Sequence, residues 1–425
     1  MITERIVLYK ELARDRILKG ILNLFDGEGT AAEAAGLCGD LVHVSDLLGF
    51  TGNLFHAYLS YLLVNDENSF SCACEMQDSP GGTLEKLALN DLEAVYELFG
   101  TDLGLLDKKY GLECFGLLKD YSVMDRGTKT FNERIRNRIL ELAGTLSQAA
   151  DPRECLDALI GFYGEYGVGK FGLNKAFRIG QDPDRFEIVP ITRIAHVNLS
   201  DLVGYESAKK KLIDNTEAFV AGRKANNCLL FGDAGTGKSS SVKGIMNAYY
   251  DRGLRLIEVY RHQFKYLNDL VAGIKNRNYR FIIYMDDLSF EDSETEYKYL
   301  KALIEGGLER KPDNILIYAT SNRRHLIHEN FRDKLDRRED DDIHESDTVQ
   351  EKLSLYNRFG VTIYFGKPSP EDFRKIVLTL AKRNGIRMDE ERLLLEANRW
   401  ELSHGGLSGR TAQQFIDYVK GTIEI

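Results

Sequence analysis

The chain has 425 residues, a length typical of about two to four domains. Hydrophobic residues make up 43% and charged residues 29%, as in an ordinary soluble globular protein, and 38 glycines with only 7 prolines exclude collagen-like and proline-rich disordered chains. The formal net charge of −10 argues against a protein coated in basic surface for bulk binding to nucleic acid or membranes.

The N-terminal third differs in charge from the rest of the chain. Residues 1–150 hold 23 acidic and 14 basic side chains, whereas the two kinds are nearly balanced in the remainder. Apolar residues recur at near-helical spacing from the start, for example at Ile6, Tyr9 and Leu12. We therefore expect a separate helical domain over residues 1–165. It carries no chemical motif, which favours a scaffold or a partner-binding element.

The cysteines and the N-terminus indicate the compartment. The six cysteines fit neither a paired metal-binding pattern nor a regular disulfide framework, so we expect reduced thiols in a cytoplasmic protein. The first 20 residues mix acids, bases and apolar residues, unlike a signal peptide. No apolar stretch approaches the length of a transmembrane helix, so we expect no membrane span.

The pattern changes twice after the helical region. Residues 166–198 contain two short β-like runs around a turn rich in Gly, Asp and Pro, which predicts a hairpin or an extended linker. From about residue 199, strands and helices alternate, which predicts a parallel sheet with helices on both faces. The five expected strands cover residues 227–231, 254–260, 281–285, 315–319 and 361–365, and the expected helices between them cover 239–250, 264–275 and 294–308. From Pro370 onward the pattern predicts three helices and no strand.

A glycine-rich loop follows the first of these strands. Residues 232–239, GDAGTGKS, match the pattern G-x-x-x-x-G-K-[ST]. Glycines let several backbone N–H groups converge on phosphate oxygens, and the following helix directs its positive end at the same oxygens. Lys238 is expected to reach the β- and γ-phosphates, and the Ser239 hydroxyl to ligate Mg²⁺. The predicted phosphate-binding residues are Gly232, Asp233, Ala234, Gly235, Thr236, Gly237, Lys238 and Ser239. The alternative, a plain glycine-rich turn, is disfavoured because the loop joins an expected strand to an expected helix.

The third expected strand ends in two carboxylates, Asp286 and Asp287. A parallel strand places its carboxyl end at the same sheet edge as the phosphate loop. Asp286 is then expected to hold Mg²⁺, directly or through water, and Asp287 to orient or deprotonate an attacking water. The alternative is a pair of solvated acids at a turn, which the phosphate loop upstream makes the weaker interpretation.

Taken together, these motifs resemble the AAA+ ATPases, and in particular the bacterial family called domain of unknown function 815. The resemblance covers about residues 165–425 and is carried by GDAGTGKS, IIYMDDLSFE, YATSNRRHLI, EKLSLYNRFG and GLSGR. It implies an α/β P-loop NTPase fold with a five-stranded parallel core over residues 199–366. It also implies a helical lid over 367–425, besides the N-terminal helical domain and the linker or hairpin.

The resemblance also implies roles for single residues around the nucleotide. Asn322 matches the sensor-1 position, which contacts the γ-phosphate or the lytic water. Arg410, in GLSGR, matches sensor 2 on the lid. Residues 201–205, including Val203 and Gly204, resemble the segment that lines adenine in these ATPases.

An arginine that acts on the nucleotide of a neighbouring subunit is implied as well. Arg358, in YNRFG, matches the arginine that does so in the bacterial replication initiator. Arg323, Arg324 and Arg332 are rivals, because they also follow the sensor-1 strand.

One position departs from the commoner AAA+ pattern. Many members have Asp-Glu at the acidic strand end, whereas this chain has Asp286 and Asp287. The Asp287 side chain is one methylene group shorter than the usual glutamate, which leaves Glu291 as a rival for positioning the water.

The implied activity is a magnesium-dependent ATPase that works as a ring or filament of like subunits, for which a hexamer is one candidate, and remodels a protein client. Two alternatives stay open. An ATP-gated nucleic-acid loader would use short basic stretches such as 209–211 and 275–280, although such stretches usually just meet water. A nucleotide-dependent assembly scaffold would hydrolyse little ATP.

Overall fold

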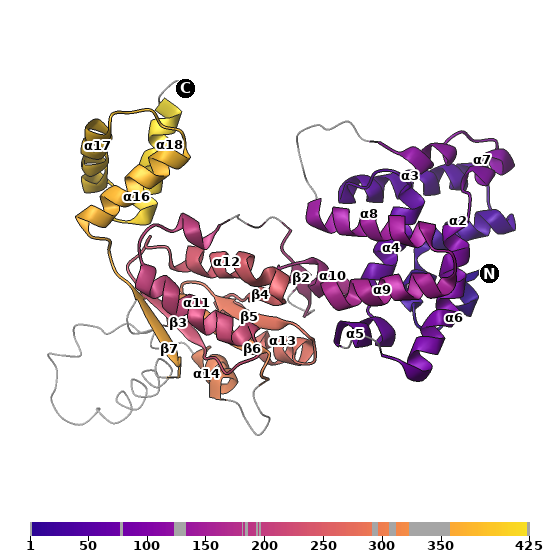
Figure 1. Cartoon of the computed structure of the whole chain (residues 1–425), viewed down its shortest axis with the longest axis horizontal. Helices are drawn as coiled ribbons and strands as arrows, with labels where there is room; N and C mark the ends of the chain where they lie inside the picture. The colour runs from indigo at the N-terminus through magenta and orange to yellow at the C-terminus, as the bar shows by residue number, and fades with distance from the viewer. Residues whose placement is uncertain are drawn as a thin grey trace. The chain divides into compact units, whose positions relative to one another are not determined.

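The computed structural model describes residues 2–76, 80–122, 133–180, 182, 186–192, 194, 197–290, 296–305, 312–322 and 358–422. The chain divides into two compact units, Met1–Asn174 and Lys175–Ile425, called here the N-terminal and the C-terminal unit. Figure 1 shows the first in indigo to magenta and the second in pink to yellow. None of the helices in these described ranges has the length and apolar character needed to cross a bilayer.

The described part of the N-terminal unit is helical, as the sequence predicts. Its α-helices are α1 (Lys10–Arg14), α2 (Arg16–Asp26), α3 (Ala31–Leu48), α4 (Leu54–Asn65), α5 (Ser69–Met76), α6 (Gly82–Phe99), α7 (Gly104–Tyr110), α8 (Glu133–Gln148), α9 (Pro152–Tyr166) and α10 (Gly169–Leu173). Two 3₁₀ helices, η1 (Ile2–Arg5) and η2 (Gly116–Asp120), complete it.

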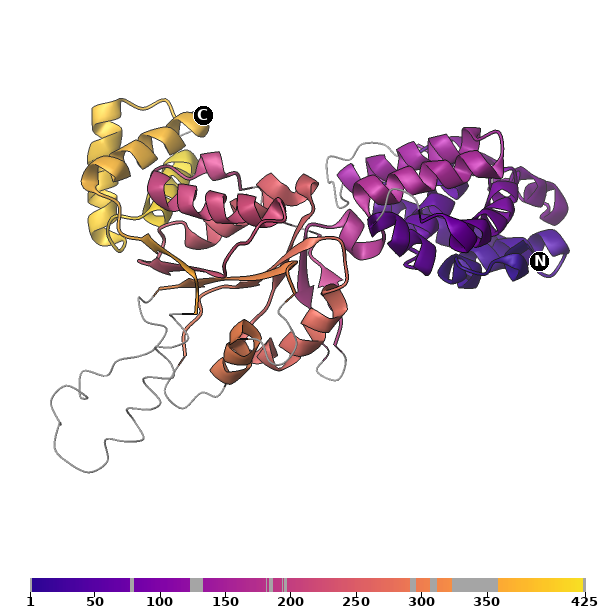
Figure 2. The ribbon, with the colours of Figure 1, turned by 60° about the horizontal axis from the view of Figure 1, so that its bottom comes forward.

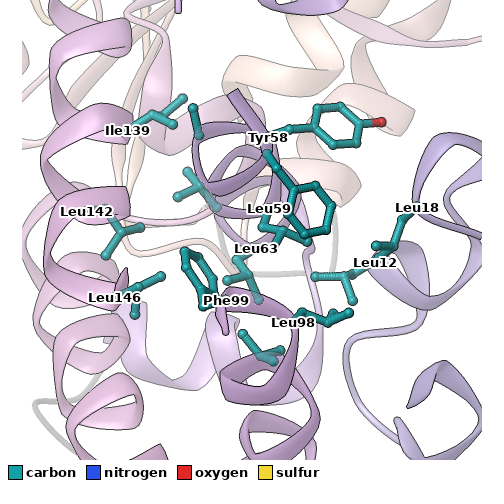
Figure 3. Close-up of a cluster of buried hydrophobic side chains, with 14 of the residues drawn as sticks. Leu12, Leu18, Tyr58, Leu59, Leu63, Leu98, Phe99, Ile139, Leu142 and Leu146 are labelled. Carbon is teal, nitrogen blue, oxygen red and sulfur yellow. The ribbon is translucent and has the colours of Figure 1, made fainter. Parts of the chain in front are cut away.

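Local signals set the ends of these helices, and one apolar core holds them together. Thr30 and Glu33 form a reciprocal capping box at the start of α3, and Gly49 ends that helix in a left-handed conformation. Leucines and aromatic residues from α1, α2, α4, α6 and α8 converge in the buried core (Figure 3). Burying such side chains is the main force that stabilises a helical unit of this kind.

The C-terminal unit contains a mostly parallel sheet. Its strands are β1 (Ala176–Ile179), β2 (Ile188–Pro190), β3 (Cys228–Gly232), β4 (Leu254–Glu258), β5 (Arg280–Met285), β6 (Ile315–Ser321) and β7 (Val361–Phe365). Their order across the sheet is β2-β1-β4-β5-β6-β3-β7, and among these described strands only β1 and β2 pair antiparallel. The prediction of an α/β fold with a parallel sheet is therefore correct.

The predicted number of strands is wrong. Within the described residues the sheet has seven strands, because the hairpin formed by β1 and β2 extends the sheet. Phe177 lies opposite Ile257 in a parallel ladder between β1 and β4. The two strands are only four and three residues long, and a run this short carries too little periodicity to reveal its partner strand.

Helices cover both faces of the sheet. In Figure 2 the pink helices α11 (Glu206–Val220) and α12 (Lys238–Tyr249) lie above it, and the orange helices α13 (Leu267–Ile274) and α14 (Tyr297–Glu305) lie below it. Three short 3₁₀ helices, η3 (Leu199–Asp201), η4 (Tyr250–Arg252) and η5 (Arg261–Tyr266), sit in the connections. Apolar residues from alternate positions of the strands pack against α11 and α12, as expected for a strand buried on both faces.

From Pro370 onward the described residues form three helices, as predicted. They are α16 (Pro370–Arg383), α17 (Glu390–Ser403) and α18 (Gly409–Thr422). The Ser369 hydroxyl accepts the Asp372 N–H at the start of α16, and Pro370 occupies the first turn. These helices bury a small apolar core of their own, centred on Phe373, Phe415 and Ile416.

Candidate functional site

The strand order brings the predicted motifs to one edge of the sheet. β3 lies beside β6, β6 lies beside β5, and all three run parallel. The loop after β3, Asn322 after β6 and the Asp286–Asp287 pair after β5 therefore follow the carboxyl ends of neighbouring strands. In parallel α/β sheets, ligands bind at this edge.

The glycine-rich loop has the backbone geometry that a phosphate cradle needs. Gly232, Gly235 and Gly237 have φ angles of 135°, 76° and 92°, a region that favours glycine. The Lys238 residue is largely buried, and its ammonium group donates to the carbonyl oxygens of Gly232 (2.9 Å) and Asp233 (2.6 Å). Burial lowers the pKa of Lys238, and the nearby aspartates partly oppose that shift.

We expect Gly232→Ala to destabilise the C-terminal unit by at least about 2 kcal/mol. A Cβ at Gly232 would overlap the carbonyl oxygen of Phe365, which also accepts the Asp233 N–H at 3.0 Å. Gly253→Ala is the matched control, because Gly253 also has a positive φ of 85°, but a Cβ added there would meet no atom within 4 Å, so its cost should be about 1 kcal/mol. Denaturant unfolding followed by circular dichroism measures both, and equal costs would contradict the packing argument.

Three hydroxyl groups converge on one oxygen of Asp286. Ser239 Oγ lies 2.7 Å, Tyr284 OH 2.7 Å and Thr320 Oγ1 2.5 Å from Asp286 Oδ1. Burial alone would raise the pKa of Asp286, but these hydrogen bonds outweigh it and hold the pKa below its ordinary value. The carboxylate therefore stays ionised, as a metal ligand must.

Asp287 lies within reach of Asn322. The Asn322 amide nitrogen donates to Asp287 Oδ1 at 2.7 Å, and its amide oxygen accepts from Lys238 Nζ at 2.9 Å. Asp287 adopts a φ of 51°, which is uncommon outside glycine. Its N–H donates to Thr320 Oγ1 at 2.9 Å, which holds this turn in place.

These groups line one cavity of about 560 Å³. Its walls come from the phosphate loop, the ends of β5 and β6, the segment before α11, and helices α16 and α18. The lining residues are Asp201, Leu202, Val203, Tyr205, Ala234, Gly235, Thr236, Gly237, Lys238, Ser239, Ser240, Asp286, Asp287, Thr320, Asn322, Ile376, Leu380, Gly409, Arg410 and Gln413. The structure thus brings together most of the residues that the sequence singled out.

The C-terminal helices contact the loop directly. The Arg410 N–H donates to the Gly235 carbonyl at 3.2 Å, and Arg410 lines the cavity. Ile376 and Leu380 of α16 add an apolar wall. The predicted position of Arg410, on a helical element beside the phosphate loop, agrees with this geometry.

The segment before α11 forms another wall. Tyr205 lies at a φ of 60°, its ring lies 5.3 Å from that of Phe365, and its hydroxyl donates to the Gly366 carbonyl at 3.0 Å. Val203 lines the cavity, whereas Gly204, with a φ of 82°, is not among the lining residues. Lys209, a largely buried residue, donates from its ammonium group to the Leu202 carbonyl at 2.7 Å and so holds this segment.

Some predicted residues do not line this cavity. Gly232 and Asp233 contribute carbonyl oxygens to Lys238 instead. Arg358, three residues before β7, is not among the lining residues of the described part of the chain. The predictions for Glu291, Arg323, Arg324 and Arg332 lie outside the described residues.

Sequence reasoning missed two residues that organise the site, Tyr284 and Thr320, whereas Tyr205 belongs to the segment 201–205 that the resemblance had already indicated. Thr320 and Asn322 are two apart at the end of one strand, and so are Tyr284 and Asp286. The period of two in a strand places each pair on the same face, and this signal was present in the sequence. The order of the strands in the sheet could not be inferred from the sequence. Thr320 reaches Asp286 only because β6 lies beside β5.

The oxygen groups in this cavity fit a magnesium ion that phosphates and water also bind, rather than a metal ion that protein side chains alone hold. Among the described residues, no group of three or more His, Cys, Asp or Glu side chains is placed to hold a metal. Mg²⁺ takes oxygen ligands and is usually held by one or two protein groups together with phosphates and water. Ser239 Oγ and the Asp286 carboxylate supply that kind of ligand in the cavity.

Comparison with family models identifies the chain. The model described as "Protein of unknown function (DUF815)" matches residues 172–423, which is more than half of the chain. The protein belongs to the DUF815 family. The resemblance inferred from the sequence motifs is thereby confirmed, and the match covers nearly all of the C-terminal unit of this DUF815 protein. No curated protein matches the chain.

Solved structures to which the chain is similar include the FIGL-1 AAA domain in complex with ADP, with a TM-score of 0.37 and 18% identity over 54% of this chain and 74% of that one. They also include a variant of RuvB from Thermotoga maritima, with a TM-score of 0.34 and 13% identity over 53% of this chain and 74% of that one.

Proposed function

We propose that this DUF815 protein binds ATP with Mg²⁺ and hydrolyses it as an AAA+ ATPase. The observation that carries the proposal is the meeting of five groups in one cavity: the Lys238 ammonium, the Ser239 hydroxyl, the Asp286 and Asp287 carboxylates and the Asn322 amide. A buried cation beside a glycine-rich loop suits a triphosphate, and a hydroxyl 2.7 Å from an ionised carboxylate suits its metal ion.

The loop and Lys238 would bind the phosphates. The backbone N–H groups between Gly232 and Ser239 and the N-terminus of α12 provide an electropositive cradle. Lys238 would exchange its hydrogen bonds to loop carbonyls and to Asn322 for bonds to the β- and γ-phosphates. Mg²⁺, held by Ser239 and Asp286, would neutralise charge on the phosphate oxygens.

Asp287 and Asn322 would position the attacking water. The water oxygen attacks the γ-phosphorus, the bond from that phosphorus to the bridging oxygen of ADP breaks, and the proton from the water passes to Asp287. Asn322 already donates to Asp287 Oδ1. Its amide therefore lies where it can link the base to the γ-phosphate.

The remaining cavity walls would hold the nucleoside and sense the phosphate. Val203, Ile376 and Leu380 offer apolar surface to a base. Arg410 lies beside the phosphate loop on α18, where its charge can respond to the γ-phosphate. Because this wall belongs to α16 and α18, these helices would act as a lid that follows the nucleotide state.

We further propose that the activity remodels a protein client in a cytoplasmic ring or filament of like subunits. Arg358 would complete the site of a neighbouring subunit. The N-terminal unit, a separate helical body with a strongly acidic first part, is the proposed client-binding element. Salt-sensitive DNA binding that ATP strengthens would instead support a nucleic-acid loader, and ATP-driven assembly without phosphate release would support a scaffold.

We expect Lys238→Ala to weaken ATP binding by about 10- to 100-fold, the value of losing charge-assisted hydrogen bonds to phosphate. The matched control is Lys210→Ala, which removes an exposed lysine that pairs with Asp214 on α11. Equilibrium binding of ATP and phosphate release measure both variants. Unchanged binding by the Lys238 variant would contradict the assignment of the loop.

A further inference from the structure

The hydrogen bonds to the Asp286 carboxylate come from three different elements. Ser239 belongs to α12, Tyr284 to β5 and Thr320 to β6, and all three hydroxyls meet Asp286 Oδ1. The hydrogen bond from Ser239 to Asp286 is already part of the proposed function, because both residues are proposed to bind Mg²⁺. The proposed function assigns no role to the hydroxyls of Tyr284 and Thr320, which donate the other two of the three hydrogen bonds.

Tyr284 is placed where its hydroxyl serves the carboxylate. It precedes Asp286 by two positions, so both side chains leave β5 on the face that packs against α12. Its side chain is 1% exposed, so its hydroxyl depends on protein partners rather than on bulk water. A phenylalanine would fill the same apolar space and lose only this donor.

Thr320 links the side chain of Asp286 to the backbone of Asp287 through one hydroxyl group. Its oxygen accepts the Asp287 N–H at 2.9 Å while its proton goes to Asp286 Oδ1 at 2.5 Å. Its own carbonyl accepts the Leu288 N–H at 2.7 Å. Thr320 therefore fixes both the orientation of Asp286 and the turn that carries Asp287.

We propose that Tyr284 and Thr320 are positioning residues that orient Asp286 as a magnesium ligand and so set the affinity of the site for the metal. The inference rests on the proposed function. Mg²⁺ demands a near-ideal octahedral set of oxygens. A carboxylate whose one oxygen is held by three donors cannot rotate freely, so it presents the metal with a fixed ligand. Groups that orient metal ligands in this way commonly change metal affinity about 10- to 100-fold when removed.

The test compares Tyr284→Phe and Thr320→Val with the wild-type chain. The matched control is Tyr318→Phe, because Tyr318 is buried on the neighbouring strand opposite Tyr284, and its hydroxyl bonds to Thr216 (2.8 Å) and Asn215 (3.0 Å) instead. ATP affinity is measured by equilibrium dialysis at a series of free Mg²⁺ concentrations and in EDTA.

We expect Tyr284→Phe to bind ATP in EDTA as the wild-type chain does. Both variants should need about 10-fold more free Mg²⁺ to reach half of the metal-dependent gain in affinity. Tyr318→Phe should need the wild-type concentration, and Thr320→Ser, which keeps the hydroxyl, should restore it. A wild-type Mg²⁺ requirement in Tyr284→Phe and Thr320→Val would overturn the inference and leave the proposed ATPase intact. No ATP binding by the wild-type chain would instead overturn the proposed function.

Discussion

Asp287→Asn is expected to bind ATP with wild-type affinity and to release phosphate about 10²- to 10⁴-fold more slowly, the usual contribution of a positioned general base. Asparagine has nearly the same size and can keep the hydrogen bond from Asn322, which is 2.7 Å long in the wild-type chain. It cannot accept the proton of the attacking water. The effect should therefore fall on turnover rather than on binding.

Two measurements separate these effects: equilibrium ATP binding and single-turnover phosphate release. Asp214→Asn provides the control, because Asp214 is an exposed acid on α11 that pairs with Lys210. Should Asp287→Asn turn over at the wild-type rate, the base would have to be another acid, and Glu291 would become the leading candidate.

Arg358→Ala is expected to slow hydrolysis about 10³- to 10⁵-fold, the range that an arginine supplied by a neighbouring subunit contributes to phosphoryl transfer. Arg358 lies three residues before β7. It is not one of the described residues that line the cavity of its own chain. Its proposed place of action is therefore the cavity of a second copy.

Mixing variants tests whether the site is shared. Arg358→Ala subunits keep an intact phosphate loop, whereas Lys238→Ala subunits keep the arginine. Neither alone should hydrolyse ATP, but a mixture should recover part of the wild-type rate, because some loops then face an intact arginine. A mixture as inactive as its components would contradict a shared site. Full activity of Arg358→Ala alone would instead move the role to Arg323, Arg324 or Arg332.

The sequence predicted the parts of the site that depend on local patterns. The loop from Gly232 to Ser239 and the Asp286–Asp287 pair each occupy a short continuous segment, so residue type and spacing were enough to find them. That they lie together also followed, because parallel strands end at one edge of a sheet. The position of Arg410 followed from the family resemblance and not from spacing.

The parts that depend on strand order were not predicted. Thr320 can bond to Asp286 only because β5 and β6 are neighbours, and periodicity does not reveal which strands pair. For the same reason β1 and β2 were expected to be a separate hairpin or linker, although β1 pairs with β4 and extends the sheet. The helical nature of the N-terminal unit was readable from its apolar spacing, but a helical core carries no chemical signature of its function.

The proposed function requires the loop beginning at Gly232 and the acid at the end of β5 to bind one magnesium–triphosphate group. Equilibrium dialysis of the folded, full-length chain against labelled ATP tests it most directly, with and without Mg²⁺. We expect saturable binding of one ATP per chain that Mg²⁺ strengthens and that Lys238→Ala weakens. Folded chain that takes up no ATP at millimolar concentration would rule out a nucleotide site at this loop.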